Sequence, residues 1–187
     1  LTHSEHLPSL LGRSRAMQTL RAEIERLAAH DTCVLISGEP GAGKHLAARI
    51  LHAHSARSKY GFIQFNFTAL PDPQAAAHLF GSEQDGVVHA GSLEQAGRGI
   101  VFLDEIGDMG LPVQATLTAA LEQRQFRRVG GSQAIALEAR VVASTQHDLK
   151  AAVAAGRLRE DLYYHLSVAP LLVPALRDHR EDVPELV

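Results

Sequence analysis

The chain has one cysteine, no tryptophan and no long apolar run among its 187 residues. The lone thiol, Cys33, cannot close a disulfide within the chain, which excludes a disulfide-stapled fold and makes a cytoplasmic setting the default expectation. No apolar segment approaches the roughly 20 residues that a membrane-spanning helix needs. The chain also does not start with a basic segment followed by an apolar one, so we expect no signal peptide and no membrane partner.

A strong excess of one charge is also missing, because 18 Lys and Arg oppose 21 Asp and Glu, for a formal net charge of -3. This balance argues against nucleic-acid binding by the bulk electrostatics of the chain itself. The 11 histidines show neither H-x3-H nor HExxH spacing. We interpret them as solvated surface side chains, with a metal site as the alternative reading. A hydrophobic content of 45% suits one globular, water-soluble domain.

Strand-like and helical segments alternate along the chain. Near-continuous apolar runs predict five buried strands, over residues 32–38, 62–67, 100–105, 139–145 and 167–173. Helical spacing predicts helices over residues 14–29, 44–55, 111–126 and 147–156. This alternation predicts an α/β fold with a parallel sheet covered on both faces. Residues 127–137 indicate a hairpin or loop around Gly130 and Gly131, and the glycine-rich residues 80–92 are interpreted as a surface loop.

A phosphate-binding motif follows the first predicted strand and opens the next helix. Residues 38–45, GEPGAGKH, fit the pattern G-x4-G-K. Its glycines let backbone N–H groups surround phosphate oxygens, the helix N-terminus adds positive charge, and Lys44 reaches the β- and γ-phosphates. The pattern continues with Ser or Thr as a magnesium ligand, where this chain has His45. The predicted ATP-binding residues are Gly38, Glu39, Pro40, Gly41, Ala42, Gly43, Lys44, His45 and Leu46.

Two acids, Asp104 and Glu105, end the predicted strand IVFLDE. Ligands of open α/β sheets bind at the carboxyl ends of the strands, so both acids are expected to face the nucleotide. Asp104 would hold Mg²⁺ directly or through water, and Glu105 would polarise the attacking water. The alternative is a buried strand that ends in two solvated acids.

With these motifs in place, the chain resembles the central AAA+ ATPase domain of NtrC-like bacterial enhancer-binding proteins, the activators of sigma-54 RNA polymerase. The segments that match in order and spacing are LLGRSRAMQTL, GEPGAGK, LFG, GIVFLDEIGDM, FRRVGG, GRLREDLYYHL and LRDHREDVPELV. The resemblance implies a P-loop NTPase fold, a three-layer sandwich around a central parallel sheet of five strands, with ATP and Mg²⁺ as cofactors. It also implies self-assembly into a ring, RNA polymerase or a sigma factor as partner, and DNA binding through a domain outside this chain.

The same resemblance divides the chain. Residues 1–10 would be a linker, residues 11–176 the α/β subdomain, and residues 177–187 the start of the connection to a helical lid that this chain lacks. The chain is therefore interpreted as part of a longer protein.

Two further site residues are implied by the resemblance alone. Asn66 matches the residue that restrains the water-activating glutamate until the partner engages. Arg159 matches an arginine finger that reaches the γ-phosphate of the neighbouring subunit.

Three positions depart from the family pattern. His165 stands at the second finger position, and Gln146 replaces the sensor asparagine. After LFG, the family has a helix–loop–helix insertion with the signature GAFTGA, which contacts the sigma factor. Here SEQDGVVHA is about five residues shorter and lacks the Phe-Thr core, so we expect impaired engagement of sigma-54.

Two functions stay open at this point. One is a ring-forming ATPase that hydrolyses the β–γ phosphoanhydride bond to drive a transcription complex, which Lys44, Asp104, Glu105 and Arg159 favour. The other is a nucleotide-gated oligomerisation module of a DNA-binding regulator with little or no hydrolysis, which the shortened loop, His165 and Gln146 favour.

Overall fold

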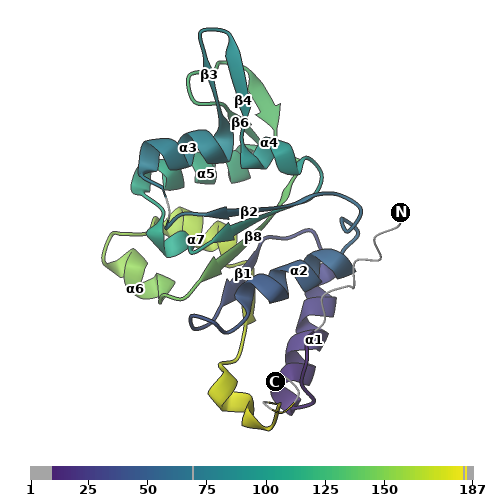
Figure 1. Ribbon diagram of the computed structural model, residues 1–187. Coiled ribbons are helices and arrows are strands. Elements are labelled where there is room, and N and C mark those ends of the chain that lie inside the picture. Colours follow the sequence, from purple (N-terminus) through teal and green to yellow (C-terminus); the bar gives the residue numbers. More distant parts are fainter. Residues whose placement is uncertain (1–9, 69, 183, 185–187) are drawn as a thin grey trace.

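A parallel sheet of five strands forms the centre of the protein (Figure 1). The computed structural model describes residues 10–68, 70–182 and 184, and the structural statements below concern these residues. The strands are β1 (Val34–Ser37), β2 (Phe62–Asn66), β5 (Ile100–Asp104), β8 (Arg140–Thr145) and β9 (Ala169–Leu172). They lie in the order β2-β5-β8-β1-β9, and every pair is parallel. The five predicted strands and the parallel sheet are confirmed.

Helices cover both faces of this sheet. One face carries α1 (Arg15–Ala28) and α2 (Lys44–His54). The other carries α3 (Asp72–Phe80), α4 (Ser92–Ala96), α5 (Leu111–Gln123), α6 (Leu149–Ala154) and α7 (Glu160–Leu166). Alternate residues of β5 therefore enter different cores: Ile100 and Phe102 pack with α1 and α2, and Val101 and Leu103 pack on the opposite side. The predicted three-layer sandwich is confirmed.

Local signals account for several of the described helix boundaries. Ser14 caps α1 by accepting a hydrogen bond from the Met17 amide at 3.2 Å. Asp148 caps α6 in the same way, through the amides of Lys150 and Ala151. Helix α5 ends at Gln123, earlier than predicted, because Arg124 adopts a left-handed conformation (φ 54°). The next residues form β6 (Gln125–Arg127), and three helices, α3, α4 and α7, have no counterpart in the sequence prediction.

The surface loop predicted over residues 80–92 is wrong. This stretch completes α3 and then forms an antiparallel hairpin of β3 (Gly81–Gln84) and β4 (Val87–Ala90). Asp85 and Gly86 join the strands with φ values of 50° and 78°, the conformation that two-residue hairpin turns require.

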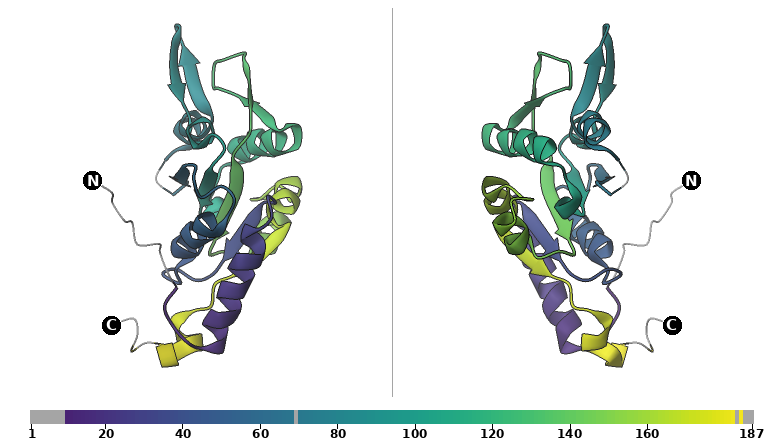
Figure 2. Two further views of the ribbon diagram at one scale, coloured as in Figure 1. Left: turned by 90° about the vertical axis from the view of Figure 1, so that its right-hand side faces the viewer. Right: turned by 90° about the vertical axis from the view of Figure 1, so that its left-hand side faces the viewer.

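The hairpin projects from the α3–α4 side of the molecule, beside the connection that follows β6 (Figures 1 and 2). The Glu83 amide donates to Val129 O at 2.9 Å, and the Val129 amide donates to Gly81 O at 2.9 Å. Arg128 adds ion pairs to Glu94 at 2.6 Å and to Glu83 at 3.7 Å. Strand β6 also pairs antiparallel with β7 (Ala134–Ala136), which confirms the hairpin predicted around Gly130 and Gly131.

The chain returns to its beginning through the 3-10 helix η2 (Leu176–Asp182). Asp182 Oδ1 accepts hydrogen bonds from the amides of Arg13 and Ser14, at 2.7 and 2.9 Å. Of the predicted linker 1–10, residues 1–9 lie outside the described residues, as do residues 183 and 185–187 of the predicted connection. None of the described residues forms a helical lid, and none of the described helices is both long and apolar enough to cross a membrane.

Candidate functional site

The phosphate-binding motif forms the loop between β1 and α2. Gly41 and Gly43 have φ values of 76° and 96°, and a Cβ placed on either would meet no atom within 4 Å. The loop therefore has an open side on which a ligand can approach the backbone closely. Gly43 is the N-cap of α2 and provides no side-chain hydrogen bond, so the helix N-terminus keeps its amides for an anion.

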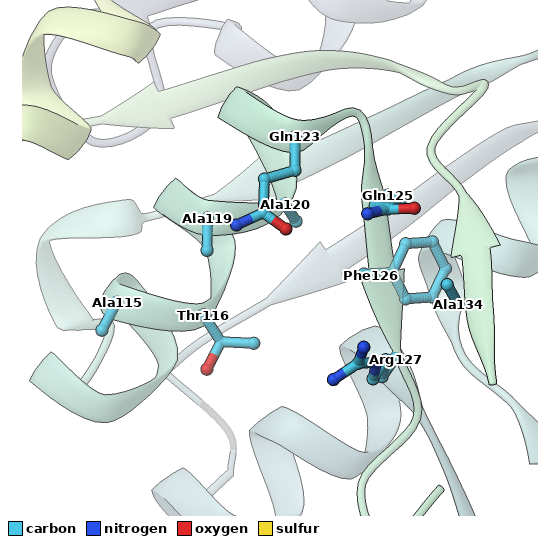
Figure 3. Close-up of a pocket in the computed structure, with 9 residues that line it drawn as sticks. All are labelled: Ala115, Thr116, Ala119, Ala120, Gln123, Gln125, Phe126, Arg127 and Ala134. Atoms are coloured by element: carbon cyan, nitrogen blue, oxygen red, sulfur yellow. The ribbon is translucent and has the colours of Figure 1, made fainter. Parts of the chain in front are cut away.

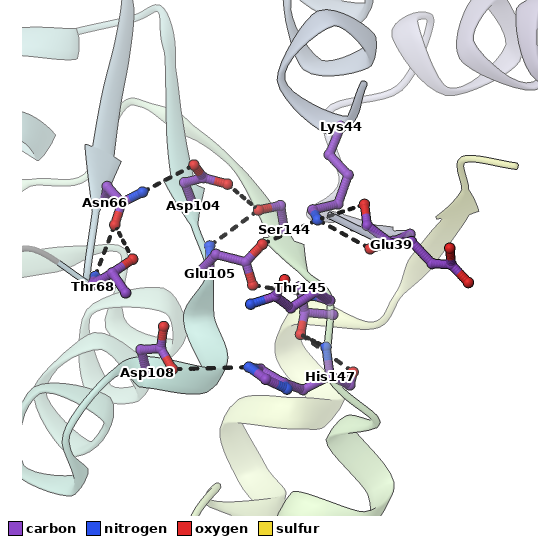
Figure 4. A network of polar contacts seen from close by, with 12 residues as sticks. Glu39, Lys44, Asn66, Thr68, Asp104, Glu105, Asp108, Ser144, Thr145 and His147 are labelled. Atoms are coloured by element: carbon purple, nitrogen blue, oxygen red, sulfur yellow. Dashed lines mark hydrogen bonds and ion pairs between the residues drawn. The ribbon is translucent and has the colours of Figure 1, made fainter. Parts of the chain in front are cut away.

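Lys44 is part of the polar network shown in Figure 4. Its side chain is only 8% exposed, and Nζ forms an ion pair with Glu105 Oε1 at 3.1 Å. Nζ also donates to Gly38 O at 3.0 Å and to Glu39 O at 3.3 Å. The structure thus brings together the lysine and the glutamate that were predicted from separate motifs.

Asp104 ends β5 as predicted, and both of its carboxylate oxygens accept hydrogen bonds (Figure 4). Ser144 Oγ donates to Oδ1 at 2.5 Å, and Asn66 Nδ2 donates to Oδ2 at 3.2 Å. Asn66 Oδ1 accepts from the amide and the hydroxyl of Thr68, at 2.8 and 2.5 Å. In this conformation Asn66 therefore bonds to Asp104 and Thr68, so its role as a restraint on Glu105 stays a prediction.

Glu105 follows β5 with a left-handed backbone, φ 56° and ψ 60°. Its amide donates to Ser144 Oγ at 3.1 Å, and its Oε2 accepts from the backbone amide of Gln146 at 3.1 Å. Gln146, at the sensor position, thus contacts Glu105 through its backbone N–H group. Every residue except proline can donate this hydrogen bond.

The oxygen atoms of Asp104 and Glu105 fit Mg²⁺, which prefers carboxylate ligands and keeps several of its waters. His45 does not extend this set, because its ring packs against Phe62 and Phe102 with centroid distances of 6.1 and 5.8 Å. Asp104 as the ligand of Mg²⁺ stays a prediction.

Arg159 lies apart from this network, as the N-cap residue of α7. Its guanidinium forms two hydrogen bonds to Asp161, Nε to Oδ1 at 3.0 Å and Nη2 to Oδ2 at 2.7 Å. These bonds raise the pKa of Arg159 and hold the pKa of Asp161 below its ordinary value. His165 pairs with Glu122 at 3.2 Å. With 44% of its side chain exposed, Arg159 faces solvent, as a finger for another subunit would.

Arg177 was not predicted as a site residue, yet it binds the phosphate loop. Its guanidinium forms two hydrogen bonds to Glu39, one of 2.6 Å from Nη1 to Oε2 and one from Nη2 to Oε1. These bonds hold the pKa of the Glu39 carboxyl below its ordinary value. No local sequence pattern could have found this pair, because η2 and the loop are far apart in the chain.

A pocket away from this network has a different lining. A pocket of about 430 Å³ lies between α5 and β6, with Arg127 as its one charged lining residue (Figure 3). The described residues contain no group of three or more His, Cys, Asp or Glu side chains placed to hold a metal ion.

Comparison with known proteins agrees with the fold described above. The family model for the sigma-54 interaction domain matches residues 10–172. The chain belongs to the sigma-54 interaction domain family. Members of this family are AAA+ P-loop domains of NtrC-like transcriptional regulators, and the five-stranded parallel sheet with its flanking helices is that fold.

Two regulators with this domain illustrate the similarity. The DNA-binding transcriptional regulator NtrC of Rhizobium meliloti (strain 1021) is 43% identical over 183 residues, which cover 95% of this chain and 38% of that protein. The transcriptional regulatory protein ZraR of Escherichia coli (strain K12) is 43% identical over 182 residues, 95% of this chain and 41% of that protein. The chain thus spans about two fifths of the length of these two relatives.

Solved structures show the same domain. NtrX from Brucella abortus in complex with ATP superposes with a TM-score of 0.91 at 40% identity, over 95% of this chain and 39% of that one. The P-loop NTPase domain of a sigma-54 transport activator from E. coli has a TM-score of 0.55 at 20% identity, over 77% of this chain and 98% of that one. At that identity the second structure supports the fold alone.

Proposed function

We propose that this sigma-54 interaction domain binds ATP with Mg²⁺ and hydrolyses its β–γ phosphoanhydride bond to ADP and phosphate. The observation that carries the proposal is the arrangement of Lys44, Asp104 and Glu105 at the carboxyl edge of one sheet, beside the open phosphate loop. The complex of the relative NtrX with ATP supports nucleotide binding at this site.

Each residue has a defined task in this reaction. The amides of the loop and of the start of α2 bind phosphate oxygens, and Lys44 neutralises the phosphate charge. Asp104 would hold the magnesium ion, which would supply positive charge next to the phosphates. Glu105 orients the attacking water and accepts its proton. Because Glu105 pairs with Lys44 at 3.1 Å here, phosphate must compete with the carboxylate for the ammonium group.

Hydrolysis in this proposal needs a second copy of the domain. Arg159 is exposed and lies outside its own phosphate network, so it can complete the site only of a neighbour in a ring. An arginine finger is worth on the order of 10³-fold or more in turnover. The test is steady-state ATP turnover of the full-length protein at several concentrations. The rate per subunit is expected to rise with concentration, and a flat rate would contradict assembly-dependent catalysis.

In the cell, we propose that the domain belongs to a bacterial transcriptional regulator that acts in the cytoplasm, with RNA polymerase or a sigma factor as partner and DNA bound by another domain. Engagement of sigma-54 is proposed to be impaired, because the residues after LFG form the short β3–β4 hairpin without an aromatic side chain.

A second candidate is a nucleotide-gated oligomerisation module with little or no hydrolysis. The short β3–β4 hairpin, His165 at the second finger position and Gln146 at the sensor position favour it. ATP-dependent assembly without turnover at any concentration would select this alternative.

A further inference from the structure

The side chain of Ser144 contacts both members of the acid pair (Figure 4). Ser144 lies on β8 and is 0% exposed. Its hydroxyl donates to Asp104 Oδ1 at 2.5 Å, and the same oxygen accepts from the Glu105 amide at 3.1 Å. We propose that Ser144 is a positioning residue that sets the orientation of Asp104 and Glu105 for hydrolysis. This inference rests on the function proposed above.

The sheet places Ser144 where the two motifs meet. Strand β8 lies between β1, which leads into the phosphate loop, and β5, which carries the acids. Ser144 pairs with Ile36 of β1, and the preceding residue Ala143 pairs with Leu103 of β5. Ser144 therefore lies beside Asp104, near the carboxyl ends of β8 and β5. Its short side chain reaches the carboxylate directly.

The contact to Glu105 stabilises an unfavourable backbone. A left-handed conformation is unfavourable for a non-glycine residue, and Glu105 adopts it at φ 56°. Strand β5 ends at Asp104, and the next amide, that of Glu105, finds its acceptor in Ser144 Oγ. This turn directs the glutamate side chain toward Lys44 and toward the Gln146 amide, both at 3.1 Å. Loss of the serine oxygen would leave the turn without its buried acceptor.

The contact to Asp104 fixes the plane of the carboxylate. Oδ2 accepts from Asn66 at 3.2 Å and from Gln64 at 3.5 Å, both on β2, and Oδ1 accepts from Ser144 on the other side. Of these three donors, Ser144 is the one that is fully buried. Groups that orient a metal ligand typically change metal affinity or activity by about 10- to 100-fold when removed.

The test compares Ser144→Ala with Ser55→Ala in the full-length protein. Ser55 is also buried, at 6% exposure, and it too makes one hydrogen bond as donor, to His52 O at 2.8 Å, and one as acceptor, from the Arg57 amide at 3.2 Å. Ser55 lies at the C-terminal end of α2, and the phosphate loop lies at its N-terminal end. The helix between them is about 16 Å long. Each substitution therefore removes one donated and one accepted hydrogen bond of a buried serine, but at a different distance from the site.

The first readout is hydrogen–deuterium exchange without nucleotide, followed on peptides that cover residues 103–107. Ser144→Ala is expected to speed exchange of the Glu105 amide, while Ser55→Ala leaves this peptide as in the unchanged protein. The second readout is ATP hydrolysis, where Ser144→Ala is expected to lower kcat by about 10- to 100-fold. The Kd for ADP is expected to stay within a factor of about two, because positioning acts on the reaction more than on ground-state binding.

A third variant, Ser144→Cys, keeps a donor on Cβ, although a weaker one on a larger atom, and should fall between the other two. It also supplies the comparison if Ser144→Ala does not fold. Rapid exchange of the Glu105 amide in the unchanged protein, or an unchanged kcat in Ser144→Ala, would overturn the inference. Absence of turnover in the unchanged protein would refute the proposed hydrolysis, and the exchange measurement alone would then decide the positioning role.

Discussion

Lys44 and Glu105 form an ion pair, Nζ to Oε1 at 3.1 Å, with 8% and 13% of their side chains exposed. The residue expected to bind phosphate thus neutralises the residue expected to activate water. Two buried opposite charges stabilise each other, and removal of one leaves the other without its partner. If phosphate binds Lys44 as proposed, we expect nucleotide binding to be coupled to the release of Glu105 from Lys44.

Lys44→Ala is expected to abolish detectable nucleotide binding. The substitution removes the cation that faces the phosphates and leaves Glu105 as an uncompensated negative charge beside them. Titration with a fluorescent ATP analogue measures the effect, and Lys150→Ala, at an exposed lysine of α6, is the control. If the analogue binds Lys44→Ala as tightly as the unchanged protein, the site has been assigned to the wrong residues.

Arg159→Ala is expected to remove the rise of ATP turnover with protein concentration while nucleotide affinity stays unchanged. The reason is that the guanidinium, which bonds to Asp161 in this structure, is proposed to act on the nucleotide of a neighbouring copy. Turnover of the full-length variant is measured from dilute to concentrated protein. Arg26→Ala removes another exposed arginine that pairs with a nearby carboxylate, Glu23, and serves as the control. A concentration dependence that survives in Arg159→Ala would refute the finger role.

The linear motifs of the sequence predicted much of this site. The phosphate loop and the acid pair could be found because each lies within one short segment, directly after an apolar strand. The five strands and the three layers followed from apolar periodicity for the same reason. Neither short motifs nor apolar periodicity show which strands are neighbours in the sheet, so contacts between neighbouring strands could not be predicted. Ser144 reads as an ordinary strand residue until β8 is known to lie beside β5.

The β3–β4 hairpin carried a usable signal that the prediction did not use. Asp85-Gly86 is a favoured turn for two-residue hairpins, and Val87 and Val88 follow it with high strand propensity. The first strand, Gly81–Gln84, has little strand propensity of its own. It is held by backbone hydrogen bonds to Val129, whose position no local pattern reveals.

Asp31→Asn is expected to lower the stability of the domain at neutral pH by up to about 1 kcal/mol, because the pair it breaks is partly solvated. Asp31 accepts two hydrogen bonds from Arg57, both at 2.8 Å, and they hold its pKa below the ordinary value of 3.8. A carboxyl with a lowered folded pKa contributes stability above its unfolded pKa and loses it as the pH falls through the folded pKa.

The difference between the unchanged protein and Asp31→Asn should therefore disappear as the pH falls below 3.8. Urea unfolding at neutral and at acidic pH measures it, with Glu25→Gln at an exposed carboxylate of α1 as the control. A difference that persists or grows at acidic pH would show that the charge of Asp31 is not its source.

The projecting β3–β4 hairpin follows LFG, after which the resemblance implies a sigma-contacting insertion. Each of its strands has four residues, which extend about 13 Å at roughly 3.3 Å per residue. Its turn is Asp85-Gly86, and its exposed apolar side chains are Val87 and Val88, at 55% and 49% exposure. Aromatic side chains dominate the binding energy of most protein interfaces, and none lies between Gly81 and Gly99.

The full-length protein is therefore expected not to open sigma-54 promoter complexes in the manner of GAFTGA-bearing relatives. The assay is open-complex formation on a duplex promoter with purified sigma-54 polymerase and ATP, with such a relative as the positive control. A chimera in which a GAFTGA insertion replaces residues 82–90 should gain activity if the hairpin is the missing element. ATP-dependent opening by the unchanged protein at the relative's rate would refute the prediction. Loss of that opening in Val87→Asp would then assign the contact to the exposed valines instead of an aromatic residue.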